Sequence, residues 1–154
     1  MKRIATFKNR LGELEVRYTR TDTVTESLKS SRQVFEFIKE FMPDYWNNRH
    51  DHEQFHVICF NNSMEPVHTF LVSQGGESAT TVDPKILFRN ALVAKCVGII
   101  LTHNHPSCRV RPSGNDIHLT KKLVKAGELL DIKVLDHIII GGDQYYSFKD
   151  EGEF

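Results

Sequence analysis

Residues 97–116, VGIILTHNHPSCRVRPSGND, decide how this chain folds and where its chemistry lies. They begin with a short apolar run, 97–102, of the kind that forms a strand buried on both faces. A loop with two prolines follows, and Ser113 then opens a long helical pattern. His103 and His105 lie two positions apart at the end of the predicted strand, so both rings should project to one side of the sheet. The stretch therefore predicts a strand, a loop and a helix that meet around two imidazoles.

Strand and helix patterns alternate on both sides of this stretch. Apolar residues at helical spacing predict a helix that begins after Ser30 or Ser31 and stops at Pro43, and another that begins after Asp83. The remaining patterns predict a helix over 113–130, strands over 13–18, 55–60, 67–72, 97–102, 132–140 and 144–148, and a polar turn segment over 44–54. This order favours an α/β fold in which a mixed β-sheet is flanked by helices.

Length and composition indicate a single domain. The chain has 154 residues, of which 40% are apolar and 26% are charged, proportions that are typical of one globular unit. We therefore expect one domain over 1–154. Its three cysteines, Cys59, Cys96 and Cys108, include no CxxC pair, which argues against a disulfide framework and against a thiolate zinc finger. A bound metal would then be held mostly by nitrogen and oxygen.

The charge balance and the lengths of the apolar runs limit the classes of partner that the chain can bind. The 20 Lys and Arg balance the 20 Asp and Glu, so the chain lacks the cationic field that general nucleic-acid binding requires. We expect DNA binding to be weak or absent, carried at most by Arg109, Arg111 and the Lys121-Lys122 pair. The chain has no apolar run of about 20 residues, the length of a membrane span, and residues 1–10 do not resemble a signal peptide. We therefore expect no membrane association and a cytoplasmic location.

A carboxylate accompanies the two imidazoles. Asp116 lies in the first turn of the helix predicted after Ser113, where a closing loop would bring it to His103 and His105. Two neutral nitrogens and one carboxylate oxygen leave a fourth tetrahedral position open for water, which is typical of a catalytic zinc site. An HxH pair also occurs by chance, and Ser113 with Asp116 is also an ordinary helix-capping arrangement. The capping and metal-binding interpretations are compatible.

These residues resemble a known motif. HNHP, six residues, and then SxxD is similar to the JAMM (MPN+) metallopeptidase motif, HxHPx6SxxD. The chain resembles RadC-type proteins beyond this motif, over about residues 30–154. The segments that carry the resemblance are EQFHVICFNN, GGESATTVDPKILFRNAL, HNHPS and LLDIKVLDHIIIGGDQYYSFKDEG.

The resemblance implies a fold, an activity and a set of site residues. The fold would be JAB/MPN-like, with a cytidine-deaminase-like architecture. Residues 1–29 lie outside the resemblance, and the alternation of residues 13–18 predicts that they form an extension with an N-terminal edge strand. The activity would be that of a zinc-dependent hydrolase, which cleaves a peptide or isopeptide amide bond of a protein or peptide substrate through a zinc-activated water. In the matching positions, Zn²⁺ would be held by His103, His105 and Asp116, Glu53 would be the general base, and Ser113 would bind the oxyanion.

Four positions leave alternatives open. Glu65 and Glu77 are acidic residues near Glu53 and are the other candidates for the base. Asn104 stands where JAMM deubiquitinases usually carry Ser or Thr, which weakens a transfer of ubiquitin specificity. Cys108 replaces the glycine that RadC-type proteins usually carry after HNHPS, and its thiol is either a fourth ligand that closes the site or a loop side chain. His137 either orients a ligand or is simply a buried, hydrogen-bonded histidine.

Two other functional classes compete with a hydrolase. A RadC-like accessory protein in DNA repair or mobile-element biology would keep the zinc site only as a vestige or for another substrate. Full-length RadC-type members carry an N-terminal helical region for which we find no counterpart here, and this counts against autonomous DNA binding. A zinc nucleobase deaminase is disfavoured because the HxE and PCxxC signatures are absent. Apolar strands at the edges of the chain make a homodimer worth testing.

Overall fold

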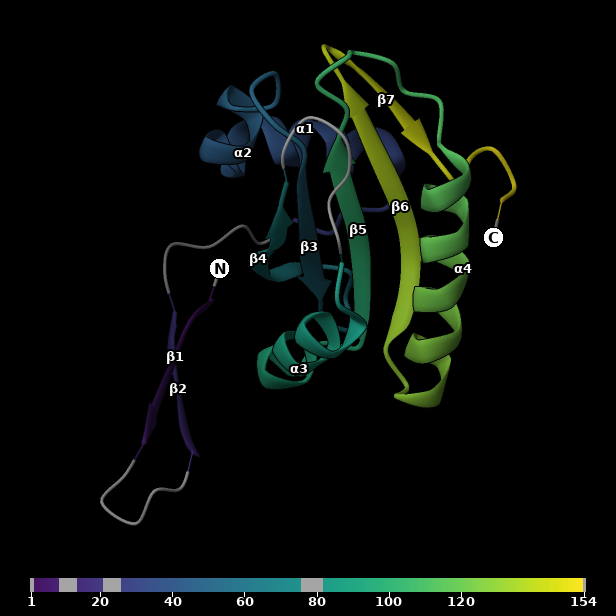
Figure 1. The fold of residues 1–154 in the computed structure, drawn as a ribbon. Helices are drawn as coiled ribbons and strands as arrows, with labels where there is room; N and C mark the ends of the chain where they lie inside the picture. Colours follow the sequence, from purple (N-terminus) through teal and green to yellow (C-terminus); the bar gives the residue numbers. More distant parts are fainter. Residues whose placement is uncertain (1, 9–13, 21–25, 76–81, 154) are drawn as a thin grey trace.

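The described residues form two β-sheets and four helices (Figure 1). The structure, a computed structural model, describes residues 2–8, 14–20, 26–75 and 82–153. The strands of the larger sheet are β3 (Gln54–Phe60), β4 (Pro66–Gln74), β5 (Gly98–Asn104), β6 (Lys133–Gly141) and β7 (Gln144–Ser147). The helices are α1 (Ser31–Phe41), α2 (Pro43–Asn47), α3 (Pro84–Ala94) and α4 (Gly114–Leu129).

The larger sheet is mixed, as the sequence predicts. Its strand order is β4-β3-β5-β6-β7. The two neighbours of β3 run antiparallel to it, β5 and β6 run parallel, and β7 returns antiparallel to β6. Parallel neighbours need a crossover connection, and α4 supplies it between β5 and β6. The first turn of α4 therefore lies near the carboxyl end of β5.

Helices cover both faces of this sheet. On one face, α3 and α4 pack on alternate residues of β3 and β5, including Val57, Ile99 and Leu101. On the other face, α1 and α2 pack on the intervening residues, such as Ile58 and Ile100. Every residue of β5 is buried, which agrees with the continuous apolar run that predicted it.

Side chains cap three helices where the sequence predicts that they begin. Ser30 accepts a hydrogen bond from the Gln33 amide at the start of α1, and Asp83 accepts one from Lys85 at the start of α3, where Pro84 occupies the first position. At α4, Ser113 and Asp116 form a reciprocal capping box. The chain direction at the start of α4 is thus fixed by the residues that the metal hypothesis also uses.

The structure corrects the prediction of a turn over 44–54. Residues 43–47 form the short helix α2, because Pro43 stops α1 and then serves as the first residue of the next helix. Tyr45 of α2 is buried, and its hydroxyl lies 3.2 Å from Thr102 Oγ1 of β5. Packing against the sheet therefore makes a helix from a segment whose composition is typical of a turn.

The smaller sheet lies at the start of the chain. β1 (Lys2–Lys8) and β2 (Leu14–Arg20) pair antiparallel with each other. The strand predicted over 13–18 is present as β2, whereas the sequence patterns do not predict β1. Within the ranges that the structure describes, no helix is long and apolar enough to cross a membrane.

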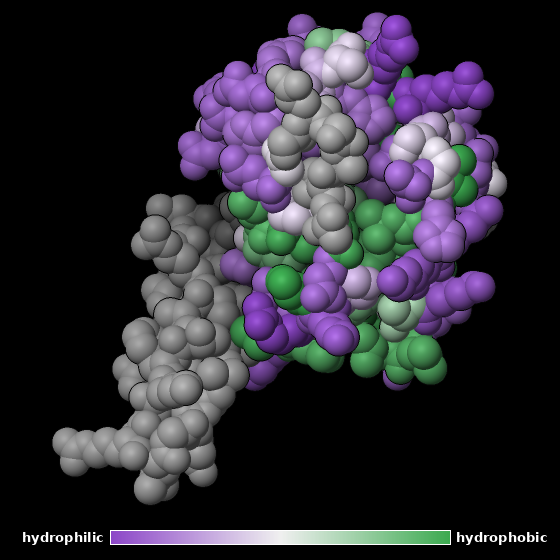
Figure 2. All heavy atoms as spheres, in the orientation of Figure 1, coloured by the Kyte–Doolittle hydropathy of each residue, from purple (hydrophilic) through white to green (hydrophobic). Residues whose placement is uncertain are grey.

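Polar and apolar surfaces separate along the larger sheet. In Figure 2, hydrophilic residues dominate the upper part of the visible face, towards the carboxyl end of β5, and hydrophobic residues gather lower, around α3. The exposed apolar side chains of α3, of the residue before β5 and of the end of α4 are Ile86, Leu92, Val97, Leu129 and Leu130. The carboxyl end of β5 therefore opens towards a polar surface.

Gly127 and Gly114 of α4 provide a matched test of the crossover. Alanine in place of a helical glycine normally stabilises by about 0.5–1 kcal/mol. A Cβ at Gly127, however, would lie 2.3 Å from the Ile132 carbonyl oxygen, whereas one at Gly114 would meet nothing within 4 Å. We expect Gly127→Ala to lower the free energy of unfolding by about 1–3 kcal/mol and Gly114→Ala to leave it unchanged or slightly raised. Urea denaturation measures both, and a Gly127→Ala chain as stable as the wild type would contradict this packing.

Candidate metal centre

His103 and His105 lie where β5 ends. His103 is buried and pairs in register with Phe55 of β3 on one side and with Ile139 of β6 on the other. The backbone amide of His105 donates to the Ile140 carbonyl at 2.8 Å, so the extended line of β5 continues through His105. The two Nε2 atoms lie 2.9 Å apart. The rings therefore meet on one side of the sheet, as the alternation of a strand requires.

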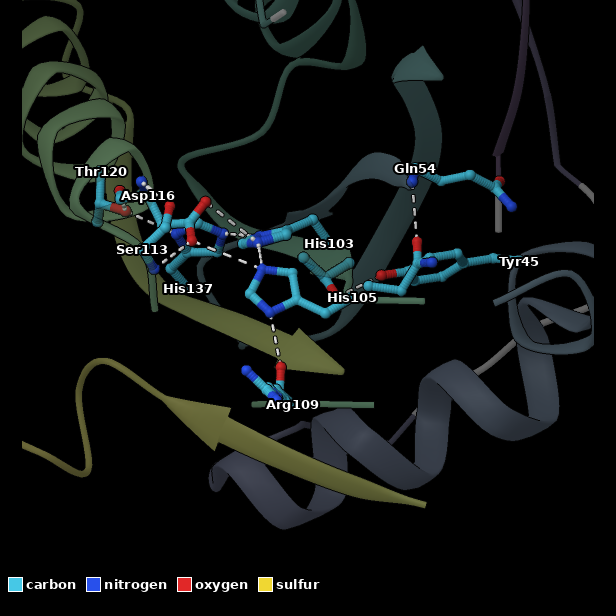
Figure 3. A network of polar contacts seen from close by, with 11 residues as sticks. Tyr45, Gln54, His103, His105, Arg109, Ser113, Asp116, Thr120 and His137 are labelled. Carbon is cyan, nitrogen blue, oxygen red and sulfur yellow. Dashed lines mark hydrogen bonds and ion pairs between the residues drawn. The ribbon is translucent and has the colours of Figure 1, made fainter. Parts of the chain in front are cut away.

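Asp116 reaches the same point from the first turn of α4 (Figure 3). Its Oδ1 lies 3.3 Å from His103 Nε2, and its Oδ2 lies 3.6 Å from His105 Nε2. Its Oδ2 also accepts the Ser113 backbone amide at 2.6 Å, while its own amide donates to Ser113 Oγ. The capping box thus holds the carboxylate in the orientation that faces both rings.

The three residues fit a zinc ion by geometry and by donor type. Zinc bonds of about 2.0–2.2 Å in a tetrahedral site place ligand atoms roughly 3.3–3.6 Å apart. The two separations between Asp116 and the imidazoles, 3.3 and 3.6 Å, match this range, and the two Nε2 atoms are closer, at 2.9 Å. His105 Nδ1 lies 2.6 Å from the Arg109 carbonyl, which can only accept, so His105 presents an unprotonated Nε2 when it is neutral. Among the described residues, no other group of three His, Cys, Asp or Glu converges in this way.

Electrostatics favour a cation at this point. Burial alone would raise the pKa of Asp116, but hydrogen bonds from His103 and His105, made when their Nε2 atoms carry protons, outweigh it and hold the pKa well below its usual range. The hydrogen bond with Asp116 raises the pKa of His105 above its ordinary value, against the opposing effect of burial. Asp116 is therefore a carboxylate under ordinary conditions, and a proton on His105 competes with a metal ion for the site.

A series of buried hydrogen bonds begins at Nδ1 of His103, the ring nitrogen that faces away from Asp116. His103 Nδ1 lies 2.8 Å from Nε2 of His137, and His137 Nδ1 lies 2.6 Å from Thr120 Oγ1. The Thr120 hydroxyl donates to the Asp116 carbonyl at 2.6 Å. Burial lowers the pKa of His137 well below its ordinary value. His137 is therefore a buried, hydrogen-bonded histidine that also contacts a candidate ligand.

Glu53 lies beside this cluster. It is half-buried and immediately precedes β3. The register pairs Phe55 with His103, so two further residues along the antiparallel pair place Glu53 next to His105. The charge of Glu53 contributes to the raised pKa of His105, which agrees with this proximity. Glu53 is therefore within the neighbourhood of the three candidate ligands without belonging to the cluster that they form.

The alternative bases are placed differently. Glu65 precedes β4 and accepts a hydrogen bond from Asn61 Nδ2 at 2.7 Å. This turn joins β3 and β4 at the end of the sheet opposite Glu53. Glu77 lies outside the residues that the structure describes. Of the two candidate bases that the structure describes, Glu53 and Glu65, only Glu53 lies near the candidate ligands.

Asn104 has a role that sequence reasoning missed. It is fully buried, and its Nδ2 donates to the carbonyls of Arg49 and His52 at 2.7 and 2.8 Å. Its Oδ1 accepts the Gln54 amide at 2.8 Å. A short amide side chain donates twice and accepts once, which a Ser or Thr hydroxyl cannot do. Asn104 therefore fixes the backbone on both sides of Glu53. The sequence signal for this role is that a polar residue stands between two candidate ligands at the end of a strand predicted to be buried.

Ser113 and Cys108 are also placed by the structure. Ser113 caps α4 and contacts Asp116, and its predicted part in binding an oxyanion stays a prediction. Cys108 is exposed, with Sγ 3.6 Å from His50 Nδ1, and it does not belong to the candidate metal-binding cluster found among the described residues. Its φ of 61° lies in the left-handed region, which explains why glycine suits this position.

Comparisons with known proteins agree with the family resemblance of the sequence. The model of the family described as the RadC-like JAB domain matches residues 28–153. A UPF0758 protein of Flavobacterium johnsoniae is 40% identical over 129 residues, which are 84% of this chain and 54% of that protein. A UPF0758 protein of Porphyromonas gingivalis is 39% identical over 128 residues, 82% of this chain and 54% of that protein.

Identity is higher over a shorter range in a third relative. A UPF0758 protein of Alkaliphilus metalliredigens is 46% identical over 99 residues, which are 64% of this chain and 43% of that protein. The chain thus spans about half the length of the curated relatives it matches. Because the family model matches residues 28–153 and the motif residues form a candidate metal-binding cluster, this chain belongs to the RadC-like JAB domain family.

Proposed function

We propose that this chain is a zinc-dependent hydrolase that cleaves a peptide or isopeptide amide bond. The observation that carries the proposal is the convergence of two imidazole nitrogens and one carboxylate, from His103, His105 and Asp116, within 2.9–3.6 Å of one another. Three protein ligands leave one tetrahedral position open, as catalytic zinc sites do. When bound, zinc would polarise the scissile carbonyl and lower the pKa of a water molecule to about 7.

The residues around the cluster have separable parts in this proposal. Glu53 takes a proton from the attacking water and returns it to the leaving amine, which is the work of a general base and acid. Ser113 Oγ already accepts the Asp116 amide, so its own proton is free to donate to the substrate oxygen as negative charge develops there. Asn104 touches no substrate and acts by holding the backbone around Glu53.

Replacing both histidines tests the metal centre. We expect one zinc ion per chain in protein purified without chelator, and loss of that zinc in the double variant His103→Ala and His105→Ala. The control is His118→Ala, because His118 lies on the same helix as Asp116, two residues further along, and is exposed. This variant should leave the zinc content unchanged. Elemental analysis decides, and unchanged zinc in the double variant would contradict the ligand assignment.

Glu53→Gln separates proton transfer from metal binding. The amide keeps the shape of the side chain but abolishes its basicity, while all three proposed ligands remain. We expect zinc to stay bound and hydrolysis to fall by about 10²–10⁴-fold, the effect of losing a positioned base. The rate is measured with the peptide or isopeptide substrate that a screen of the zinc-loaded wild type identifies.

Glu65→Gln is the matched control for this measurement, because Glu65 lies at the other end of the β3–β4 pair. It should leave the rate unchanged. A Glu53→Gln chain without zinc would make Glu53 a ligand, and one with near-normal activity would place the base elsewhere, with Glu77 as the next candidate. A zinc-loaded wild type that hydrolyses no member of the screen would contradict the proposed activity itself.

A further inference from the structure

A chain of hydrogen bonds joins two of the candidate ligands through the protein interior. It runs from His103 Nδ1 to His137, from His137 to Thr120 Oγ1, and from Thr120 to the backbone carbonyl of Asp116 (Figure 3). All three contacts measure 2.6–2.8 Å. Neither His137 nor Thr120 is a candidate ligand, and both are buried.

The last acceptor in this series of hydrogen bonds decides which atom donates in each of them. The Asp116 carbonyl can only accept, so the single proton of the Thr120 hydroxyl points to it. The opposite arrangement, with that proton on the His137 side, would leave two bare oxygens 2.6 Å apart. Thr120 Oγ1 therefore accepts from His137, and the proton of His137 lies on Nδ1.

The direction carries through His137 to His103. A neutral imidazole with its proton on Nδ1 presents a lone pair at Nε2, and this lone pair faces His103 Nδ1 at 2.8 Å. His103 must then carry its proton on Nδ1. Phe148 stacks on the His137 ring with centroids 4.9 Å apart, and the Phe55 ring lies 5.5 Å away. These apolar neighbours disfavour a charged ring.

We propose that Thr120 and His137 are positioning residues that hold the proton of His103 on Nδ1, so that its Nε2 lone pair faces His105 and Asp116. The inference rests on the proposed zinc site, for which it supplies the required form of one ligand. The Arg109 carbonyl, four residues away along the chain, holds the proton of His105 on Nδ1 in the same way. His103 is buried at the end of β5, and its proton is set by side chains from α4 and β6.

Ring-nitrogen spectra of the metal-free full chain test the proton positions directly. Two-bond ¹H–¹⁵N correlations at pH 8 distinguish protonated from unprotonated imidazole nitrogens. We expect His137 to carry its proton on Nδ1 and not on Nε2, and His103 to carry one on Nδ1. A proton on His137 Nε2, alone or together with one on Nδ1, would overturn the proposal. This measurement uses the wild type, so it does not depend on whether any variant folds.

Thr120 variants test the consequence for metal binding. Thr120→Val keeps the shape of the side chain but removes the acceptor for His137, whereas Thr120→Ser keeps the hydroxyl. Competition with a chelator should show Zn²⁺ affinity about 10–100-fold weaker for Thr120→Val, the range for losing a group that orients a ligand, and close to wild type for Thr120→Ser. Equal affinity in Thr120→Val and wild type, or an equal loss in both variants, would overturn the proposal. A wild type that binds no zinc contradicts the proposed function, and the metal-free spectra still decide this inference.

Discussion

The parallel pairing of β5 with β6 is the constraint on which the site depends. Two parallel neighbours cannot be joined by a hairpin, so the chain must cross over, and here it does so through α4. The crossover begins where β5 ends, and the first turn of α4 must therefore lie beside His103 and His105. The capping box then orients Asp116 within that turn. The same residues that start the crossover thus supply the third candidate ligand.

The alternation of β5 divides the work between the two faces of the sheet. His103 lies on the face covered by α3 and α4, where it meets Asp116, while Asn104 projects to the other face and holds the backbone around Glu53. One residue step along one strand therefore sets the ligands and the proposed base relative to each other. Of the buried side-chain polar atoms in the described ranges, only Ser73 Oγ lacks a hydrogen-bond partner. The polar groups beneath the site are satisfied, which is the condition for a buried network to hold one arrangement.

Sequence patterns predicted the parts of this arrangement that depend on local spacing. The HxH pair follows from the period of a strand, and Ser113 with Asp116 follows from helix capping, so the three candidate ligands could be named before their contacts were known. Glu53 required the family resemblance, because its nearness to His105 depends on the register between β3 and β5. The helix α2 escaped prediction because five residues carry little periodicity. Asn104 and Thr120 escaped for a different reason: their partners lie 50–55 and 17 residues away along the chain.

The loop between β5 and α4 packs closely against the end of β6, and this contact affects the surroundings of His105. Gly141, at the end of β6, lies so close to this loop that a Cβ there would stand 2.6 Å from the Cys108 carbonyl oxygen. Cys108 adopts a left-handed conformation, which costs an ordinary residue about 1–2 kcal/mol. The next residue, Arg109, supplies the carbonyl that accepts from His105 Nδ1. The glycine at 141 therefore lets the loop approach the sheet closely enough for the Arg109 carbonyl to contact His105, while side chains of β6 and α4 supply the buried hydrogen-bond chain behind His103.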